Sequence, residues 1–242
     1  NASAITSMDF PDTEKDMRTY LGMVNFFSDC IPGCQLILAP LQARVNFHSR
    51  GAPTEAELAA FHRIRAILSE EGGPVLMPPD TSRPFHVATD ASDHIGLGAV
   101  LFQTDDQGRQ RPVRYFSHRW KDNEQHWKTV DKEAYAVVTS IKRWDQFLST
   151  GRFKLYTDAE AVSFMMSKKE SKSPRMHNWA LELQNYNFDL LHLPGSANTV
   201  PDALSRLAHL VASAQEVVGL PCSRPADGDE GSVGAPAAPL PA

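Results

Sequence analysis

Four acidic side chains stand at positions that a simple structural pattern does not explain. Two of them close strand-like runs, and two lie on predicted helices, on the inward face or in the first turn: Asp90, Asp158, Glu133 and Asp202. A lone buried carboxylate is costly unless it is paired, protonated or bound to metal. Like charges that lie close together also repel. Because magnesium binds through a few carboxylates and waters, the set predicts a carboxylate-built metal site.

Each acid also has a structural explanation when it is taken singly. Asp202, directly after Pro201, could complement the dipole at the start of a helix, and Glu133 could be a charge at a helix edge. The two aspartates, however, end strands, and open α/β sheets place their sites at the carboxyl ends of strands. Four such acids together favour a shared site over four separate structural roles.

The elements that would position these acids alternate after residue 80. Three strand-like runs suggest an antiparallel meander, and helical spacing then takes over. The order predicts an α/β fold, with helices packed on one mixed five-stranded sheet. The expected strands are Phe85–Asp90, Leu97–Gln103, Pro112–Ser117, Phe153–Thr157 and Phe188–Leu193, and the expected helices are Asn123–Ser149, Ala159–Met166, Pro174–Tyr186 and Pro201–Ala214.

Composition divides the chain into three parts. Residues 1–80 are predicted to be helical, with helices that start after Thr13 and Thr54, and Gly/Pro-rich punctuation follows near residue 72. Residues 81–214 hold the alternating elements. Residues 215–242 form a Pro/Gly/Ala-rich tail that is expected to be disordered.

Bulk features exclude several classes of protein. No apolar run approaches the ~18 residues of a membrane span, and no signal-peptide pattern opens the chain. Three cysteines in 242 residues favour a reduced, intracellular setting, and the first residue, Asn1, suggests a piece of a longer protein. Net charge is −5, yet residues 109–154 carry 11 Lys and Arg against 5 Asp and Glu. That basic segment is either a phosphate-facing surface or a solvated face of mixed charge.

Four sequence blocks contain the four acids in order. They are TDASDHIGLGAVL, DKEAYAVVTSIKRW, YTDAEAV and PGSANTVPDALSR. Together they resemble the ribonuclease H domain of gypsy-type LTR retrotransposon polyproteins. The upstream segment FPDTEKDMRTYLGMVNFF, followed by IPG and LAPL, resembles the end of the reverse transcriptase. The resemblance runs from about residue 9 to 208 and implies a ribonuclease H-like fold.

The resemblance implies a function for the acids. Asp90, Glu133, Asp158 and Asp202 match the tetrad that holds two Mg²⁺ ions about 4 Å apart, with Mn²⁺ as a possible substitute. The implied enzyme is an endoribonuclease that hydrolyses the RNA strand of an RNA–DNA hybrid within a reverse transcriptase, a nucleotidyltransferase. Its implied partners are the hybrid and an upstream polymerase domain, in a cytoplasmic particle or the nucleus. The polymerase centre itself is absent from this chain, and oligomeric state is left open.

Further site residues follow from position. His192 and Asn198 lie ten and four residues before Asp202 and match the His and Asn of cellular and retroviral ribonucleases H, where the His assists proton transfer and product release. His192 could equally be an ordinary histidine on an exposed strand. Between Trp120 and Trp127 we expect a minor-groove surface that contacts 2′-hydroxyls. The expected substrate contacts are Ser117, Arg119, Asn123 and Gln125.

One departure from the family argues for an alternative. The family usually has TDHKAL where this chain has TDAEAV, so Ala159 and Glu160 replace a His-Lys pair, which should weaken binding to the hybrid. The alternative is a decayed or co-opted module that binds nucleic acid or protein without turnover. Retention of all four acids favours the active enzyme.

Overall fold

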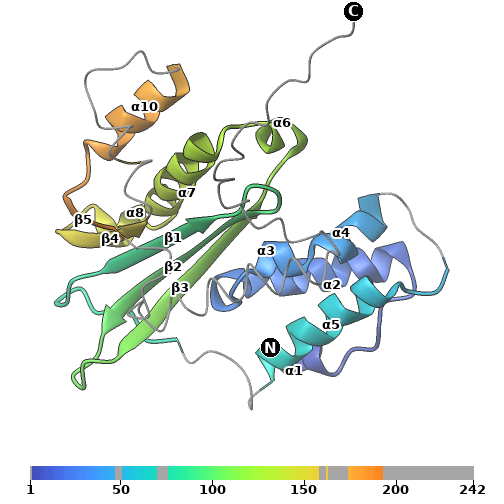
Figure 1. Ribbon diagram of the computed structural model, residues 1–242. Coiled ribbons are helices and arrows are strands. Elements are labelled where there is room, and N and C mark those ends of the chain that lie inside the picture. Colours follow the sequence, from blue (N-terminus) through green and yellow to red (C-terminus); the bar gives the residue numbers. More distant parts are fainter. Residues whose placement is uncertain (1, 47–50, 70–75, 158–161, 163–173, 193–242) are drawn as a thin grey trace, which may run out of the picture.

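One mixed sheet organises the second half of the protein (Figure 1). The computed structural model describes residues 2–46, 51–69, 76–157, 162 and 174–192. Strand order is β3-β2-β1-β4-β5. The first three strands form the predicted antiparallel meander, and β4 and β5 run parallel to β1. The strands are β1 (His86–Ala91), β2 (Gly96–Thr104), β3 (Gln110–Arg119), β4 (Phe153–Thr157) and β5 (Phe188–His192).

Strand register brings several predicted site positions to one edge of the sheet. Asp90 pairs with Gly98, and Gly98 pairs with Ser117 on the next strand. At the same edge, Thr157 of β4 is in register with His192 of β5. The carboxyl ends of β1, β3, β4 and β5 therefore all point the same way.

The predicted helix over Asn123–Ser149 is a series of three helices. They are α6 (Asp122–Gln125), α7 (Thr129–Arg143) and α8 (Asp145–Leu148). Trp144 and Leu148 pack in the same core as α7, so the apolar spacing continues across the break at Trp144. A later helix, α10 (Pro174–Leu183), ends three residues before the predicted Tyr186. The helices expected over 159–166 and 201–214 and the tail lie outside the described residues, Val162 apart.

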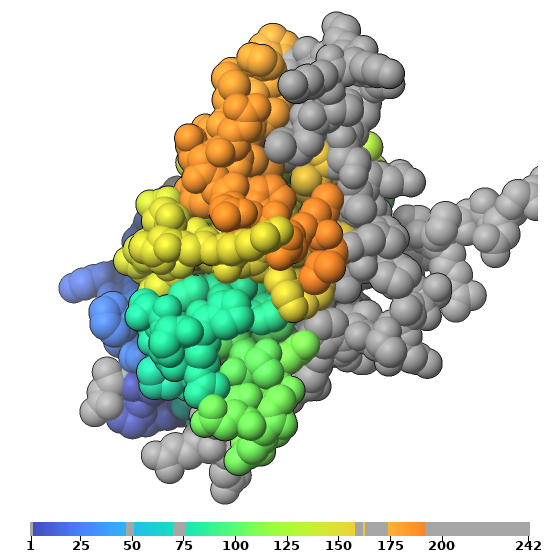
Figure 2. Space-filling view, turned by 90° about the vertical axis from the view of Figure 1, so that its left-hand side faces the viewer, coloured from blue at the N-terminus to red at the C-terminus, as the bar shows by residue number. Residues whose placement is uncertain are grey.

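The main core lies between α7 and one face of the sheet. Alternation along a strand sends successive side chains to opposite faces. Val87, Ala99 and Leu155 therefore face α7, whereas Ala88 and Val100 form a second cluster on the other face. Figure 2 views the sheet from the end where β1 begins. Its bands run from orange (α10 and β5) through yellow β4 and teal β1 to the green β2–β3 hairpin.

Residues 2–46 and 51–69 form a helical unit with its own core. Thr13 caps the second helix by accepting from the backbone N–H of Asp16, and Thr54 and Glu57 form a reciprocal capping box. A cluster of buried residues that includes Tyr20, Leu41 and Phe61 joins the helices. The elements are α1 (Ala2–Thr6), α2 (Glu14–Phe26), η1 (Ser28–Cys30), α3 (Cys34–Ile37), α4 (Ala39–Asn46) and α5 (Glu55–Leu68).

The helical unit docks beside strand β3 through η1 and α3 (Figure 1). The backbone N–H of Gln35 donates to the Ser117 hydroxyl at 3.0 Å, and Leu36 packs on Ile95. At the outer margin, Arg143 of α7 pairs with Asp29 at 2.9 Å. The two parts thus share polar and apolar contacts.

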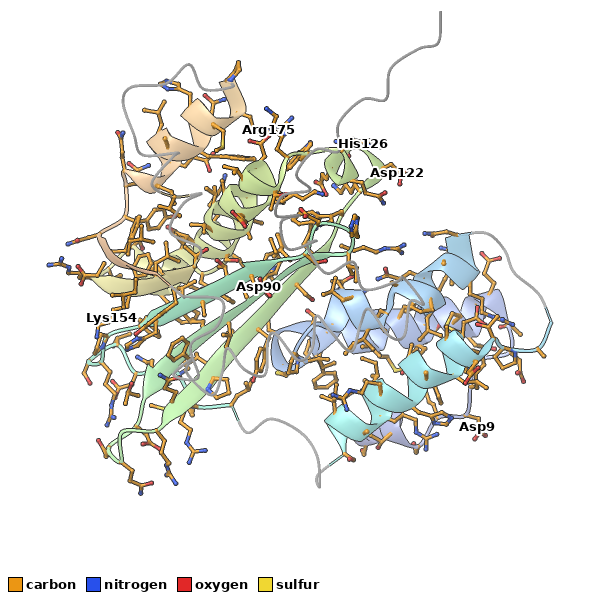
Figure 3. All side chains as sticks on the ribbon, viewed as in Figure 1. Asp9, Asp90, Asp122, His126, Lys154 and Arg175 are labelled. Carbon is orange, nitrogen blue, oxygen red and sulfur yellow. The ribbon has the colours of Figure 1, made fainter. Side chains whose placement is uncertain are left out.

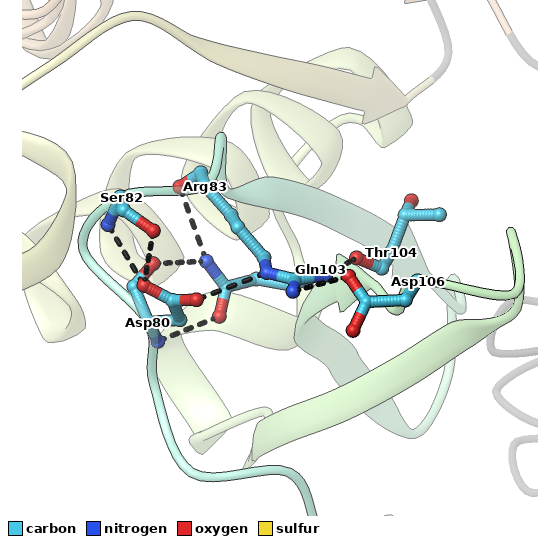
Figure 4. A network of polar contacts seen from close by, with 6 residues as sticks. All are labelled: Asp80, Ser82, Arg83, Gln103, Thr104 and Asp106. Atoms are coloured by element: carbon cyan, nitrogen blue, oxygen red, sulfur yellow. Dashed lines mark hydrogen bonds and ion pairs between the residues drawn. The ribbon is translucent and has the colours of Figure 1, made fainter.

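A polar network fixes the chain where it enters the sheet, at the end opposite Asp90 (Figure 4). The buried side-chain amide of Gln103 accepts from the backbone N–H of Asp80 and donates to the carbonyls of Asp80 and Arg83. Arg83 in turn pairs with the carboxylates of Asp80 at 2.9 Å and Asp106 at 2.6 Å. Within the described part of the chain, no helix has both the length and the apolar character needed to cross a membrane.

Candidate active site

Asp90 lies near the carboxyl end of β1 (Figure 3) and is exposed to solvent. Its cross-strand neighbour is Gly98, which offers no side chain to pair with it. Protein nevertheless surrounds the carboxyl group closely enough that burial raises its pKa, and only the backbone N–H of Ala91 works in the opposite direction. A carboxylate that is open to solvent but poorly stabilised by its neighbours favours the binding of a cation.

The ends of β1 and β4 are joined just before the two predicted aspartates. The buried hydroxyl of Thr89 donates to that of Thr157 at 3.0 Å. In the sequence, Asp90 and Asp158 follow these threonines directly. Asp158 itself, with Asp202 and Asn198, lies outside the described residues, and of His192 only the backbone position at the end of β5 is described.

Glu133 lies on the second turn of α7, half-buried, and α7 packs against β1. Strand alternation directs Asp90 to the sheet face opposite α7, because Val87 faces the helix and Ala88 does not. The two carboxylates therefore come from different layers, the sheet and the helix that packs on it. Among the described residues, no three or more His, Cys, Asp and Glu side chains are grouped so as to hold a metal ion.

The predicted substrate contacts divide into exposed and buried residues. Arg119 is exposed at the end of β3, and Asn123 and Gln125 are exposed on α6. Ser117 is only 7% exposed, and its hydroxyl accepts the Gln35 hydrogen bond. Its surroundings are those of an internal contact between the two parts of the protein.

The expected minor-groove surface between the tryptophans needs a correction at Trp120. Its side chain is 3% exposed, and its indole N–H donates to the Ser92 carbonyl at 2.6 Å, so it is a core residue. Trp127 is half-buried beneath Arg175, whose guanidinium carbon lies 4.0 Å from the ring centroid. Trp144 is buried, and Trp179 packs against the main core.

Sequence reasoning missed a set of residues that hold the loop after Asp90. Lys132, Thr129 and Trp120 all donate hydrogen bonds to residues 92–93. A lysine next to Glu133 on an amphipathic helix gives no sequence signal of burial, because lysine is normally exposed. Only the fold, which brings this loop against α7, reveals the contact.

The strand order β3-β2-β1-β4-β5, with α7 packed across one face of the sheet, defines a ribonuclease H-like fold. Residues 80–186 match the family model described as the RNase H-like domain found in reverse transcriptase. This part of the chain is therefore similar to the RNase H-like domains of reverse transcriptases, and its sheet has the RNase H-like fold.

The most similar sequences found include retrotransposon polyproteins. The Retrovirus-related Pol polyprotein from transposon opus of Drosophila melanogaster is 32% identical over 216 residues, which cover 84% of this chain and 21% of that protein. The Transposon Tf2-3 polyprotein of Schizosaccharomyces pombe is 33% identical over 200 residues, covering 81% of this chain and 15% of that protein. The chain thus spans about a fifth or less of the length of these relatives.

Solved structures support the same fold. The foamy viral protease-reverse transcriptase in complex with an RNA/DNA hybrid superposes with a TM-score of 0.62 at 18% identity, covering 83% of this chain and 27% of that chain. Its complex with dsDNA gives a TM-score of 0.64 at 20% identity, covering 83% and 41%. Both comparisons include more of this chain than residues 80–186.

Proposed function

We propose that the protein is the ribonuclease H portion of a gypsy-type retrotransposon reverse transcriptase, which hydrolyses the RNA strand of RNA–DNA hybrids. The observation that carries the proposal is the placement of Asp90 near the carboxyl end of β1. The neighbouring strand β4 ends at Thr157, directly before Asp158 in the sequence, and β5 beyond it ends at His192. The match of residues 80–186 to the RNase H-like family model supports it. So does the similarity to polyproteins of transposons.

The donor set fits a hard divalent cation. Oxygen ligands from Asp90, Glu133, Asp158 and Asp202 are those that magnesium prefers, and the raised pKa of Asp90 indicates a carboxylate that its own neighbours leave poorly compensated. When bound, a pair of magnesium ions supplies an activated water and stabilises the leaving oxygen. In this proposal the four carboxylates hold the metal, and His192 and Asn198 assist proton transfer and substrate placement.

The substrate surface would lie along the same edge of the sheet. Arg119 offers an exposed cation for a phosphate, and the exposed amides of Asn123 and Gln125 can donate to and accept from 2′-hydroxyls. The helical unit beside β3 would be the end of the reverse transcriptase, with the polymerase domain upstream. Such a polyprotein would act inside the cell, in a cytoplasmic particle or the nucleus.

The direct test is cleavage of a labelled RNA–DNA hybrid by the full 242-residue chain. We expect cutting that requires Mg²⁺ or Mn²⁺ and leaves the DNA strand intact. Asp90→Asn and Glu133→Gln should each reduce the rate at least a hundredfold, because each removes a charged metal ligand. Asp106→Asn makes the same chemical change in the β2–β3 turn at the opposite end of the sheet and should retain the wild-type rate.

Two outcomes would contradict the proposal. Wild-type rates in both Asp90→Asn and Glu133→Gln would show that the site is elsewhere. A wild-type chain that binds the hybrid tightly without metal and never cuts it, in Mg²⁺ or Mn²⁺, would instead favour the non-catalytic module that Glu160 suggests.

A further inference from the structure

Lys132 of α7 is a lysine in a buried position, directly before Glu133. Its side chain is only 4% exposed, whereas lysine ammonium groups nearly always reach water. The ammonium donates to the backbone carbonyl of Asp93 and lies 6.0 Å from the centroid of the Trp120 ring. The partners therefore come from the loop after β1 and from the end of β3.

The loop of residues 92–95 is held by side chains from two elements. One turn before Lys132, the Thr129 hydroxyl donates to the Asp93 carboxylate at 2.8 Å. From the other side, the indole N–H of Trp120 donates to the Ser92 carbonyl at 2.6 Å. Two contacts from α7 and one from the end of β3 thus fix the loop on both sides.

This loop begins two residues after Asp90. Between them, Ala91 packs in a small cluster with Trp120 and with Ala136, which lies one turn after Lys132 on α7. Asp90 and Glu133 stand on different layers, so their separation depends on how α7 is held against the end of β1. The Lys132 contact acts at that junction.

The chemistry of the contact points beyond simple packing. Burial of an ammonium group costs desolvation energy, and a single backbone carbonyl is a weaker partner than a carboxylate. A methionine of similar length would fill the same space without that cost. What the Lys132 ammonium adds, beyond apolar contact, is a directional hydrogen bond that fixes the position of the loop.

We propose that Lys132 is a positioning residue for the metal site, and that its bond to the Asp93 carbonyl sets the location of Asp90 relative to Glu133. The proposal rests on the proposed nuclease function, because the metal site belongs to that function. Residues that orient the ligands of a metal ion contribute to its affinity, and loss of such a residue typically weakens metal binding about 10–100-fold.

The test compares Lys132→Met with Lys142→Met in the full chain. Lys142 lies on the same helix, but its side chain is 55% exposed, so the same chemical change there should leave metal binding unaltered. Mn²⁺ binding is measured by isothermal titration calorimetry, and the Mg²⁺ concentration for half-maximal hybrid cleavage is measured in parallel. For Lys132→Met we expect the Mn²⁺ dissociation constant and the half-maximal Mg²⁺ concentration each to rise about tenfold. Most of the cleavage rate should be recovered at saturating metal.

Thr129→Val tests the same junction from an exposed side chain, and thermal unfolding shows whether each variant folds. Thr129→Val should also weaken Mn²⁺ binding, but by less than Lys132→Met does. If Lys132→Met does not fold, a folded Thr129→Val with wild-type Mn²⁺ affinity overturns the positioning role. A folded Lys132→Met with wild-type metal affinity overturns it as well. A wild-type chain that neither binds Mn²⁺ nor cuts the hybrid overturns the proposed function and this proposal together.

Discussion

At the scale of single residues, His86 makes stability depend on pH. Its ring stacks against those of Phe102 and Tyr156, and burial, helped by the charge of Lys154, lowers its pKa from 6.5 to about 4. Between these values the unfolded chain takes up a proton that the folded chain refuses. The stabilising contribution is therefore complete above pH 6.5 and is lost as the pH falls towards 4.

The expected size is about 2 kcal/mol, since one pKa unit corresponds to ~1.4 kcal/mol and solvent screening reduces the full value. His86→Phe keeps the ring stack and removes the proton. Its urea midpoint should decline less steeply than that of the wild type between pH 6.5 and 4. His126→Phe, at an exposed histidine, should leave the wild-type slope unchanged. Parallel slopes for His86→Phe and the wild type would contradict the assignment.

Residue patterns predicted much of the candidate site but not its surroundings. Asp90 and Glu133 were singled out because acids break an apolar pattern; Asp90 lies near the carboxyl end of β1, and Glu133 lies on α7, which packs against that strand. The roles of the four acids and the predicted substrate contacts stay predictions. Lys132 and Ser117 could not be placed from sequence, because their partners come from Asp93 and Gln35, far away along the chain.

At the scale of elements, hydrophobic spacing indicates which residues face the core, and it gives less information on where backbone hydrogen bonds break. Strand β4 was predicted at its observed bounds, Phe153–Thr157, because apolar and polar residues alternate along it. The start of α5 was predicted after Thr54, where the structure has a capping box. The helix breaks at residues 126–128 and at Trp144 were missed. At Trp144 the core-facing pattern continues although the helix ends.

Substitution of Gly96 tests how closely the start of β2 approaches its neighbours. A Cβ at this position would overlap the carbonyl oxygen of His118 and stand 2.7 Å from Cδ2 of Leu36. Because the first clash is with backbone, it cannot be relieved by a rotamer change, and Gly96→Ala should cost about 2–3 kcal/mol in urea unfolding. Gly22 on α2 has open space around its Cβ position, so Gly22→Ala should instead stabilise by up to about 1 kcal/mol. Equal stability of the two variants would contradict this close approach.

At the scale of the whole molecule, the helical unit docks on the RNase H-like domain, and we expect this contact to couple the stability of the two parts. Leu36 is 1% exposed and packs on Ile95, in the loop that follows Asp90. Truncation of a buried leucine costs about 2–5 kcal/mol. All four tryptophans lie between residues 120 and 179, so tryptophan fluorescence reports on the domain and not on the helical unit.

Leu36→Ala therefore gives a clear test of coupling between the two parts. If they unfold together, the variant should lower the urea midpoint of the fluorescence transition, and circular dichroism should report the same midpoint. Leu181→Ala, at a leucine that is 48% exposed on α10, should leave both signals near wild type. A circular dichroism transition that moves to lower urea while the fluorescence transition stays in place would mean that the helical unit unfolds independently. If the two parts unfold together, the helical unit, like Lys132, supports the loop that follows Asp90. Ile95, on which Leu36 packs, belongs to the same four-residue loop that Lys132 holds.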